Sequence, residues 1–157
     1  MAKHLLSKET YARLEAEVAH LAHTVLPEIA DKISAARELG DLSENGDYHA
    51  AKDEYGWKND RKNMLVHMLE ESEITSPPSN GEVGVLSVVT ILFDGDDPDD
   101  AETYLIGHIE EKRDGLEVMS PASPIGGALL GHKESDHVTV TLESGSKVSV
   151  SIVKVEN

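Results

Sequence analysis

Between Ser7 and Leu39, apolar side chains recur at intervals of three or four residues. This spacing places them on one face of an α-helix. Ser7 can cap the N-terminus of this helix, and Gly40 follows its last turn, where a left-handed backbone favours glycine. At 1.5 Å per residue, such a helix is roughly 50 Å long and must project beyond a small domain. The residues of the apolar stripe are Leu14, Val18, Leu21, Val25, Ile29, Ile33 and Ala36.

A proline interrupts this pattern at position 27. Pro27 removes one backbone hydrogen-bond donor, so we expect the helix to bend or divide near His23 to Pro27. Consecutive intervals of four residues around Ile29 indicate a break in heptad register at the same place.

A second helical pattern runs from about Asn45 to Ile74. Gly46 and Gly56 weaken it, each by roughly 1 kcal/mol relative to alanine. Because only a tight turn separates the two helices, residues 1–75 are predicted to form an antiparallel coiled-coil hairpin. Its second apolar stripe consists of Tyr48, Ala51, Tyr55, Leu65, Met68 and Leu69.

Two consecutive prolines, Pro77 and Pro78, end the helical pattern and indicate a linker over residues 76–81. After Gly81 the apolar period changes to two, which is typical of strands. Residues 82–157 are therefore predicted to form a small antiparallel sheet domain. The expected strands are Val85 to Phe93, Glu102 to Ile109, Leu116 to Ser120, Val138 to Leu142 and Val148 to Ile152, with a hairpin turn at Glu143 to Ser146.

One short helix interrupts these strands. Ser123 is its expected N-cap and Pro124 its first residue, while Gly131 marks its end. Leu129 and Leu130 are expected to face the core. The chain as a whole is thus of the α+β class.

Bulk composition excludes several kinds of protein. The formal net charge of −16 argues against binding nucleic acid through its phosphates, which requires many lysines and arginines. The chain has no cysteine, which excludes disulfides and thiolate metal sites. The N-terminal segment lacks a signal-peptide core and no stretch is long enough to span a membrane, so we expect a cytoplasmic protein without membrane contact.

The predicted turn between the helices carries two acids, Asp41 and Glu44, with Asp47 one turn further on. One interpretation is a capping box, in which Asp41 caps the second helix and Glu44 bonds back to Asp41. The other is half of a metal site. Mg²⁺ usually takes one or two protein carboxylates and keeps several waters, so this turn has too few ligands of its own and implies a partner that supplies the rest.

Two stretches carry a resemblance to a known family. Residues 38–54, ELGDLSENGDYHAAKDE, closely resemble the coiled-coil tip of the bacterial GreA/GreB transcript cleavage factors, and residues 120–131, SPASPIGGALLG, resemble the signature of their C-terminal domain. The order of elements matches from about Leu5 to Val155. Two specific motifs in the right order indicate membership of this family.

The resemblance implies a mechanism. In this family the hairpin enters the secondary channel of RNA polymerase, and its acidic tip helps the polymerase hold a second Mg²⁺ and a nucleophilic water. Backtracked RNA is then cut near its 3′ end by the polymerase's own active site. By this analogy, Asp41 and Glu44 are the catalytic acids. Their carboxylates complete the coordination of the Mg²⁺ that the polymerase holds. The resemblance implies that the protein itself is not an enzyme and that it holds no Mg²⁺ stably alone.

Neighbouring tip residues have two interpretations each. Arg37 and Lys52 are candidates for contact with RNA or phosphate, or they solvate a helix face and pair with nearby acids. Four further residues match the family motif and are candidates for supporting the tip: Asn45, Asp47, Tyr48 and His49. Alternatively, they are ordinary turn and packing residues.

The C-terminal domain of the family is similar in fold to FKBP-type prolyl isomerases. Isomerase activity needs an aromatic-lined pocket, and Phe93 and Tyr104 are the only aromatic residues after Gly81. We therefore expect no isomerase activity. The family uses this domain to grip the rim of the channel. The candidate docking residues are Ser120, Pro121, Ser123, Pro124 and Ile125.

The charge of the hairpin favours a GreA-like over a GreB-like factor. Residues 1–75 hold 9 Lys and Arg against 15 Asp and Glu, a net charge of −6, and relatives that grip RNA strongly carry a basic patch there. We expect a monomer that acts on RNA polymerase and stimulates transcript cleavage. Two alternatives are a regulator that occupies the channel without promoting cleavage and a coiled-coil adaptor unrelated to polymerase. The acidic loop 94–100 lacks the spacing of a calcium site and is expected to be solvated.

Overall fold

A computed structural model describes residues 4–40 and 45–157. The chain divides into two compact units. One comprises residues 11–72, and the other combines residues 4–10 with residues 73–157. The first stretch of chain therefore clusters with the sheet unit, although its sequence pattern continues into the hairpin.

The first long helix is divided, as Pro27 predicts. Helix α1 (Lys8–His20) leads into a π-helical segment (Leu21–Val25) and then into α2 (Leu26–Glu38), with Pro27 in the first turn of α2. The Leu26 N–H donates to the Leu21 carbonyl, five residues back, as in a π-helix. Gly40 follows α2 with φ +115°, so its positive φ confirms the expected glycine at the helix end.

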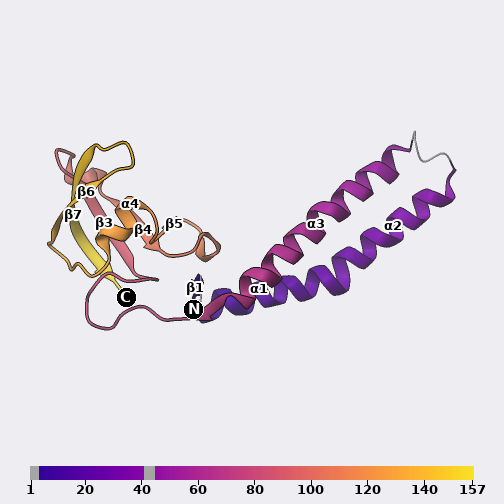
Figure 1. Cartoon of the computed structure of the whole chain (residues 1–157), viewed down its shortest axis with the longest axis horizontal. Coiled ribbons are helices and arrows are strands. Elements are labelled where there is room, and N and C mark those ends of the chain that lie inside the picture. Colours follow the sequence, from indigo (N-terminus) through magenta and orange to yellow (C-terminus); the bar gives the residue numbers. More distant parts are fainter. Residues whose placement is uncertain (1–3, 41–44) are drawn as a thin grey trace. The chain divides into compact units, whose positions relative to one another are not determined.

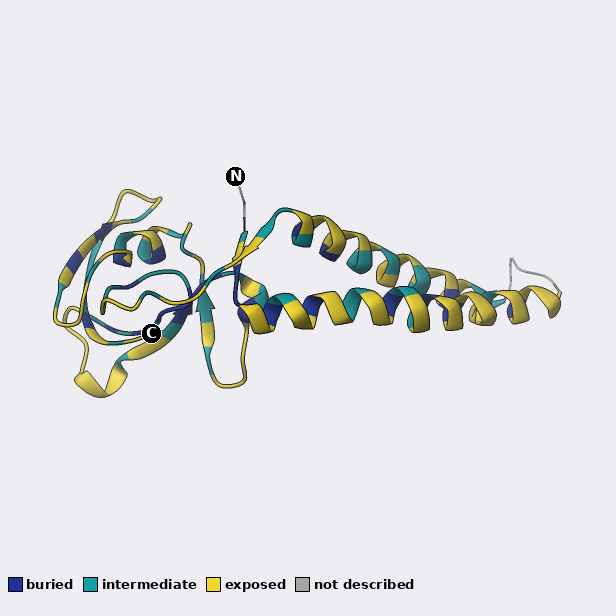
Figure 2. Cartoon of the chain, turned by 90° about the horizontal axis from the view of Figure 1, so that it is seen from below, coloured by how far each residue is buried: buried dark blue, intermediate teal, exposed yellow. Residues whose placement is uncertain are grey.

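The second helix, α3 (Gly46–Glu70), lies alongside the π-helical segment and α2 in the antiparallel hairpin (Figure 1). Figure 2 shows buried and half-buried positions alternating with exposed ones along both arms. All predicted stripe residues are buried or half-buried, which confirms the helical period. The buried members of the stripes are Leu14, Leu21, Ile29, Ala36, Ala51, Leu65 and Met68.

The end of α3 differs from the sequence prediction. Helix was expected up to Ile74, but α3 stops at Glu70 and residues Ser72–Ile74 form strand β2. Strand β2 pairs with β1 (His4–Leu6), and the Thr75 N–H donates to the Leu6 carbonyl at 2.8 Å. Both strands are three residues long, and their pairing depends on a partner more than sixty residues away, which a local pattern cannot reveal.

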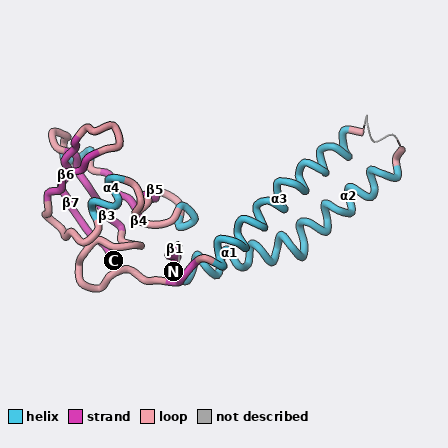
Figure 3. Tube along the Cα trace, in the orientation of Figure 1, coloured by secondary structure: helices cyan, strands magenta, loops and turns pink. Residues whose placement is uncertain are grey.

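The sheet unit has five strands in the order β5-β4-β3-β7-β6, drawn as magenta segments in Figure 3. They are β3 (Val88–Phe93), β4 (Glu102–Ile106), β5 (Glu117–Met119), β6 (His137–Thr141) and β7 (Lys147–Glu156). Pairs β3–β4, β3–β7 and β6–β7 are antiparallel, whereas β4–β5 is parallel.

The sheet is therefore mixed, and the prediction of a purely antiparallel sheet was wrong for β5. Strand β4 does not return through a hairpin. The chain leaves it through a short 3₁₀ helix (Ile109–Glu111) and a turn closed by the Arg113–Leu116 bridge. This crossover returns the chain to the same edge in the same direction, which is the connection that parallel pairing requires.

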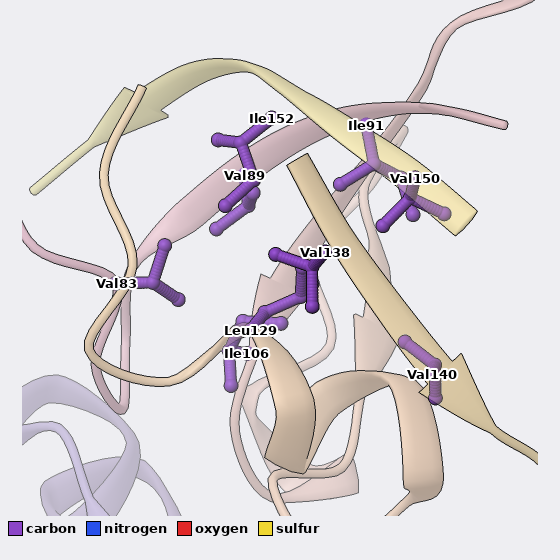
Figure 4. Packing of buried hydrophobic residues seen from close by; sticks show 9 residues of the cluster. All are labelled: Val83, Val89, Ile91, Ile106, Leu129, Val138, Val140, Val150 and Ile152. Atoms are coloured by element: carbon purple, nitrogen blue, oxygen red, sulfur yellow. The ribbon is translucent and has the colours of Figure 1, made fainter. Parts of the chain in front are cut away.

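The core of this unit lies between the sheet and helix α4 (Pro124–Leu129). Figure 4 shows nine apolar side chains that converge from four strands, α4 and the segment before β3. Alternating residues of β6 and β7 supply several of them, as the period of two predicts. The nine are Val83, Val89, Ile91, Ile106, Leu129, Val138, Val140, Val150 and Ile152.

Helix α4 begins as predicted, since the Ser123 hydroxyl accepts from the Gly126 N–H at 3.1 Å and Pro124 occupies its first turn. Leu129 is buried, but Leu130 is 38% exposed, so the prediction of two core leucines was wrong for Leu130. Leu130 is the C-cap, and its ψ of 133° places it outside the helical backbone whose period the prediction followed.

A buried carboxylate joins the N-terminal stretch to the sheet unit. Glu111 is 1% exposed and accepts hydrogen bonds from the Ser7 backbone N–H (2.7 Å) and the Ser7 hydroxyl (2.9 Å). The Thr10 hydroxyl donates to the same carboxylate at 2.8 Å. Ser7 also caps α1 by accepting from the Thr10 N–H, which confirms the predicted N-cap. Glu111 was not singled out from the sequence, because only the tertiary fold brings it to the start of α1.

Candidate functional site

The end of the hairpin is held together by Asn45. Its side-chain oxygen accepts from the Tyr48 N–H at 3.1 Å and so caps α3. Its side-chain nitrogen donates to the Ala36 carbonyl at 3.1 Å, in the last turn of α2. The amide of Asn45 thus pairs a backbone N–H in the first turn of α3 that has no partner within the helix. It also links the start of α3 to the last turn of α2.

This cap corrects one of the two interpretations of the acidic turn. A capping box required Asp41 as the N-cap of the second helix. The N-cap of α3 is instead Asn45, and α3 begins at Gly46. Asp41 and Glu44 themselves lie outside the described residues.

Two cationic side chains lie near the ring of Tyr48. The Arg37 guanidinium carbon is 5.9 Å from the centre of its ring, and the Lys52 ammonium nitrogen is 6.0 Å away. The His49 ring meets the Tyr48 ring edge to face at 5.3 Å. Tyr48 is half-buried, whereas Arg37 and Lys52 are exposed. The structure therefore brings together four of the residues that the sequence singled out here.

Asp47 lies on another face of the hairpin end. It lines a groove of about 350 Å³ between α2 and α3. Leu39, which is 77% exposed, forms one wall of this groove. The buried residues Ala36 and Ala51 also line it, and their small side chains let the two helices approach closely.

The second group of predicted residues lies at the loop before α4. Ser120, Ser123, Pro124 and Ile125 line an open groove of about 360 Å³. Its other walls are Tyr104, Val118, Met119 and Leu142, so it is mainly apolar. Ser120 and Pro121 also line a neighbouring hollow of about 530 Å³, together with His4 and His108.

The loop geometry depends on Gly126. The Ser120 carbonyl accepts from the Ser123 N–H at 3.1 Å and from the Ser123 hydroxyl at 2.7 Å. A Cβ on Gly126 would lie only 2.1 Å from this same carbonyl oxygen. The glycine therefore allows the loop to fold against the start of α4.

Two titratable groups near these hollows are perturbed. The Tyr104 hydroxyl donates to a Glu102 carboxylate oxygen at 2.5 Å, and this bond, together with burial and the charges of Glu102 and Glu117, raises the pKa of Tyr104 to about 12. Burial and the neighbouring His4 lower the pKa of His108, although Glu110 and Glu111 act in the opposite direction. The two imidazole rings are 5.0 Å apart and meet edge to face.

Both halves of the chain match one family. The profile of the N-terminal domain of GreA/GreB transcription elongation factors matches residues 4–74, and that of their C-terminal domain matches residues 78–157. The chain belongs to the GreA/GreB family of transcription elongation factors. This confirms the resemblance seen in residues 38–54 and 120–131.

Individual GreA/GreB relatives align over nearly the full length. Transcription elongation factor GreA of Streptomyces coelicolor is 43% identical over 96% of this chain and 92% of its own length. GreA of Mycolicibacterium smegmatis is 40% identical over 96% and 93% of the two chains. Among solved structures, the Gfh1 protein of Thermus thermophilus is 25% identical and covers 98% of each chain, with a TM-score of 0.44.

Within this GreA/GreB chain, the described residues contain no group of three or more His, Asp or Glu side chains that could hold a metal ion. In the acidic loop, Asp97 caps a short 3₁₀ helix (Pro98–Asp100), and Asp94 pairs with His137 at 2.9 Å. Of residues 4–40 and 45–157, no helix is long and apolar enough to cross a membrane.

Proposed function

We propose that this elongation factor inserts the end of its helical hairpin into the secondary channel of RNA polymerase and stimulates cleavage of backtracked RNA. The observation that carries the proposal is the position of Asp41 and Glu44 in the sequence between α2 and α3, within the tip motif of the family. The chemistry remains that of the polymerase, and this chain completes the site.

The donor set suits a shared magnesium ion. Asp41 and Glu44 offer hard carboxylate oxygens, and Mg²⁺ commonly takes only one or two of these from a protein. When bound, the ion stabilises the attacking and leaving oxygens of a phosphodiester. The part of this chain is to bring two carboxylates to an ion that the polymerase holds in its active site, at the end of two helices that pack against each other.

Two features support precise placement of the tip. Asn45 ties the start of α3 to the end of α2 through two hydrogen bonds. Arg37 and Lys52 stand beside the turn as cations for the phosphate charge of the RNA. The apolar groove at Ser120, Ser123 and Ile125 is the surface through which the sheet unit docks on the rim of the channel.

The test uses a stalled, backtracked elongation complex with Mg²⁺, in which the RNA 3′ end is followed after addition of the protein. The substitutions Asp41→Asn and Glu44→Gln remove one negative charge each at nearly constant size. We expect each to slow cleavage by about 100-fold, the scale of losing one stabilising group at a reacting centre. Binding to the complex should be retained.

Asp60→Asn is the matched control, because it makes the same change of charge on an exposed position of α3 far from the turn. It should cleave like the wild type. Binding of the wild-type protein without cleavage would instead indicate a channel-occupying regulator. No binding to polymerase at all would indicate an adaptor of another kind and would refute both polymerase functions.

A further inference from the structure

The ring of Tyr48 is approached by two cations from different helices. Arg37 comes from the last turn of α2, and Lys52 lies one helical turn after Tyr48 on α3. Both charged groups lie within about 6 Å of the ring centre, the range in which a cation is attracted to an aromatic face. One aromatic side chain thus holds two like charges that would otherwise repel each other.

These two cations have no described acidic partner. No ion pair joins Arg37 or Lys52 to a carboxylate among the residues that the structure describes. Arg61 of the same hairpin behaves differently, since it contacts the Glu17 carboxylate at 2.9 Å. Among the described residues, the contact that both cations share is therefore the ring of Tyr48.

The backbone fixes this arrangement. Asn45 bonds to the Tyr48 N–H and to the Ala36 carbonyl, so Tyr48 is held opposite the end of α2. Arg37 is the residue directly after Ala36. One side chain therefore links the backbone of Tyr48 to that of the residue before Arg37, and the Tyr48 ring is half-buried there.

We infer that Tyr48 is a positioning residue that holds Arg37 and Lys52 as a paired cation for the phosphodiester backbone of the RNA. The inference rests on the proposed function. The planar guanidinium group of arginine can donate two hydrogen bonds to one phosphate, and the compact ammonium group of lysine can bind a neighbouring phosphate oxygen. Because both side chains are already held in place, they lose less conformational entropy when the RNA binds.

The first experiment compares Tyr48→Phe with Tyr48→Leu in the cleavage assay at saturating protein. Phenylalanine keeps the aromatic face, whereas leucine keeps much of the bulk without it. We expect Tyr48→Leu to slow cleavage by about fivefold and Tyr48→Phe to stay within about twofold of the wild type. The protein concentration that gives half-maximal cleavage should be unchanged, because the docking surface is intact.

Tyr55→Leu is the matched control, since it removes another half-buried tyrosine from the same helix. Thermal unfolding followed by circular dichroism checks that each variant is folded. A general loss of hairpin stability would slow cleavage equally in Tyr48→Leu and Tyr55→Leu, and that result would overturn the inference.

The second experiment is a double-mutant cycle with Arg37→Ala and Lys52→Ala. If the ring acts through the cations, each of these substitutions should have a smaller effect in the Tyr48→Leu background than in the wild type. Full additivity, or equal losses in Tyr48→Phe and Tyr48→Leu, would overturn the inference while leaving the proposed function intact. Absence of cleavage with the wild-type protein would refute the proposed function itself, and this inference with it.

Discussion

The two units of the chain bury apolar surface in different ways. The sheet unit concentrates nine buried side chains in one cluster between the sheet and α4 (Figure 4). The hairpin has only a seam between two helices, with one buried residue per turn or fewer. A cluster tolerates long irregular connections around it, whereas a seam depends on specific contacts at its ends, such as the Asn45 bridge.

This difference suits the two tasks that we propose. A narrow pair of helices can enter a channel because no bulky core surrounds it. The sheet unit provides surface grooves, and hydrogen bonds between Ser120 and Ser123 shape the loop before α4. Substitutions in each unit can test how far the two are independent and which contacts stabilise each of them.

The largest effect on stability is expected for Ile152→Ala, because Ile152 is 1% exposed in the centre of the sheet core. The free energy of unfolding of this unit should fall by about 2–5 kcal/mol. Hydrogen exchange should accelerate in β3, β6 and β7 while amides of α2 and α3 keep their protection. The neighbouring Val153, which is 52% exposed, provides the control Val153→Ala. Equal acceleration in both units would contradict their independence.

A smaller effect is expected for Glu111→Gln. The carboxylate of Glu111 accepts three hydrogen bonds from Ser7 and Thr10, and an amide has only one oxygen to replace two. At least one buried donor then loses its partner, which should cost about 1–3 kcal/mol in urea unfolding. Glu143→Gln, on an exposed turn, should leave the unfolding midpoint unchanged.

Two glycine-to-alanine substitutions should have opposite signs. At Gly126 the new Cβ would collide with the Ser120 carbonyl, so Gly126→Ala should destabilise the sheet unit by about 1–3 kcal/mol. At Gly56, within α3, nothing lies within 4 Å of a Cβ, and Gly56→Ala should stabilise the hairpin by up to about 1 kcal/mol. Thermal unfolding of each variant measures the sign directly. Destabilisation by both would show that α3 is restricted at Gly56 by something other than local packing.

The smallest effect is a pH dependence at His108. Because burial and His4 lower its pKa, the unfolded state binds a proton more readily than the folded state. The stability that His108 contributes is therefore present above the unfolded pKa of about 6.5 and is lost as the pH falls through that value towards the lower folded pKa. Its Nδ1 also accepts from the Glu110 N–H at 3.1 Å, which requires an unprotonated ring nitrogen.

His108→Asn keeps an acceptor for that N–H and removes the titration. The loss of urea midpoint between about pH 7.5 and 5.5 should be smaller in this variant than in the wild type. His20→Asn, at an exposed site on α1, serves as the control and should keep the wild-type pH dependence. An unchanged pH dependence in His108→Asn would show that His108 is not the group responsible.

Local sequence determined most of the helical arm and the alternating strands. Intervals of three and four residues set the stripe from Leu14 to Ala36, and the period of two set β6 and β7, because side-chain direction repeats with the backbone of each element. Pro27 and Gly40 marked a break and an end through their own backbone preferences. The motif of residues 38–54 also identified the family, as the matches to both domains confirm.

Tertiary structure decided what depends on contacts between distant residues. The pairing of β1 with β2, the parallel run of β5 and the burial of Glu111 by Ser7 and Thr10 leave no periodic signal. The same holds at the hairpin end, where the sequence offered Asn45, Tyr48 and their charged neighbours only as separate candidates. Their grouping arises because α2 and α3 pack antiparallel, which brings residues of two helices onto one aromatic ring.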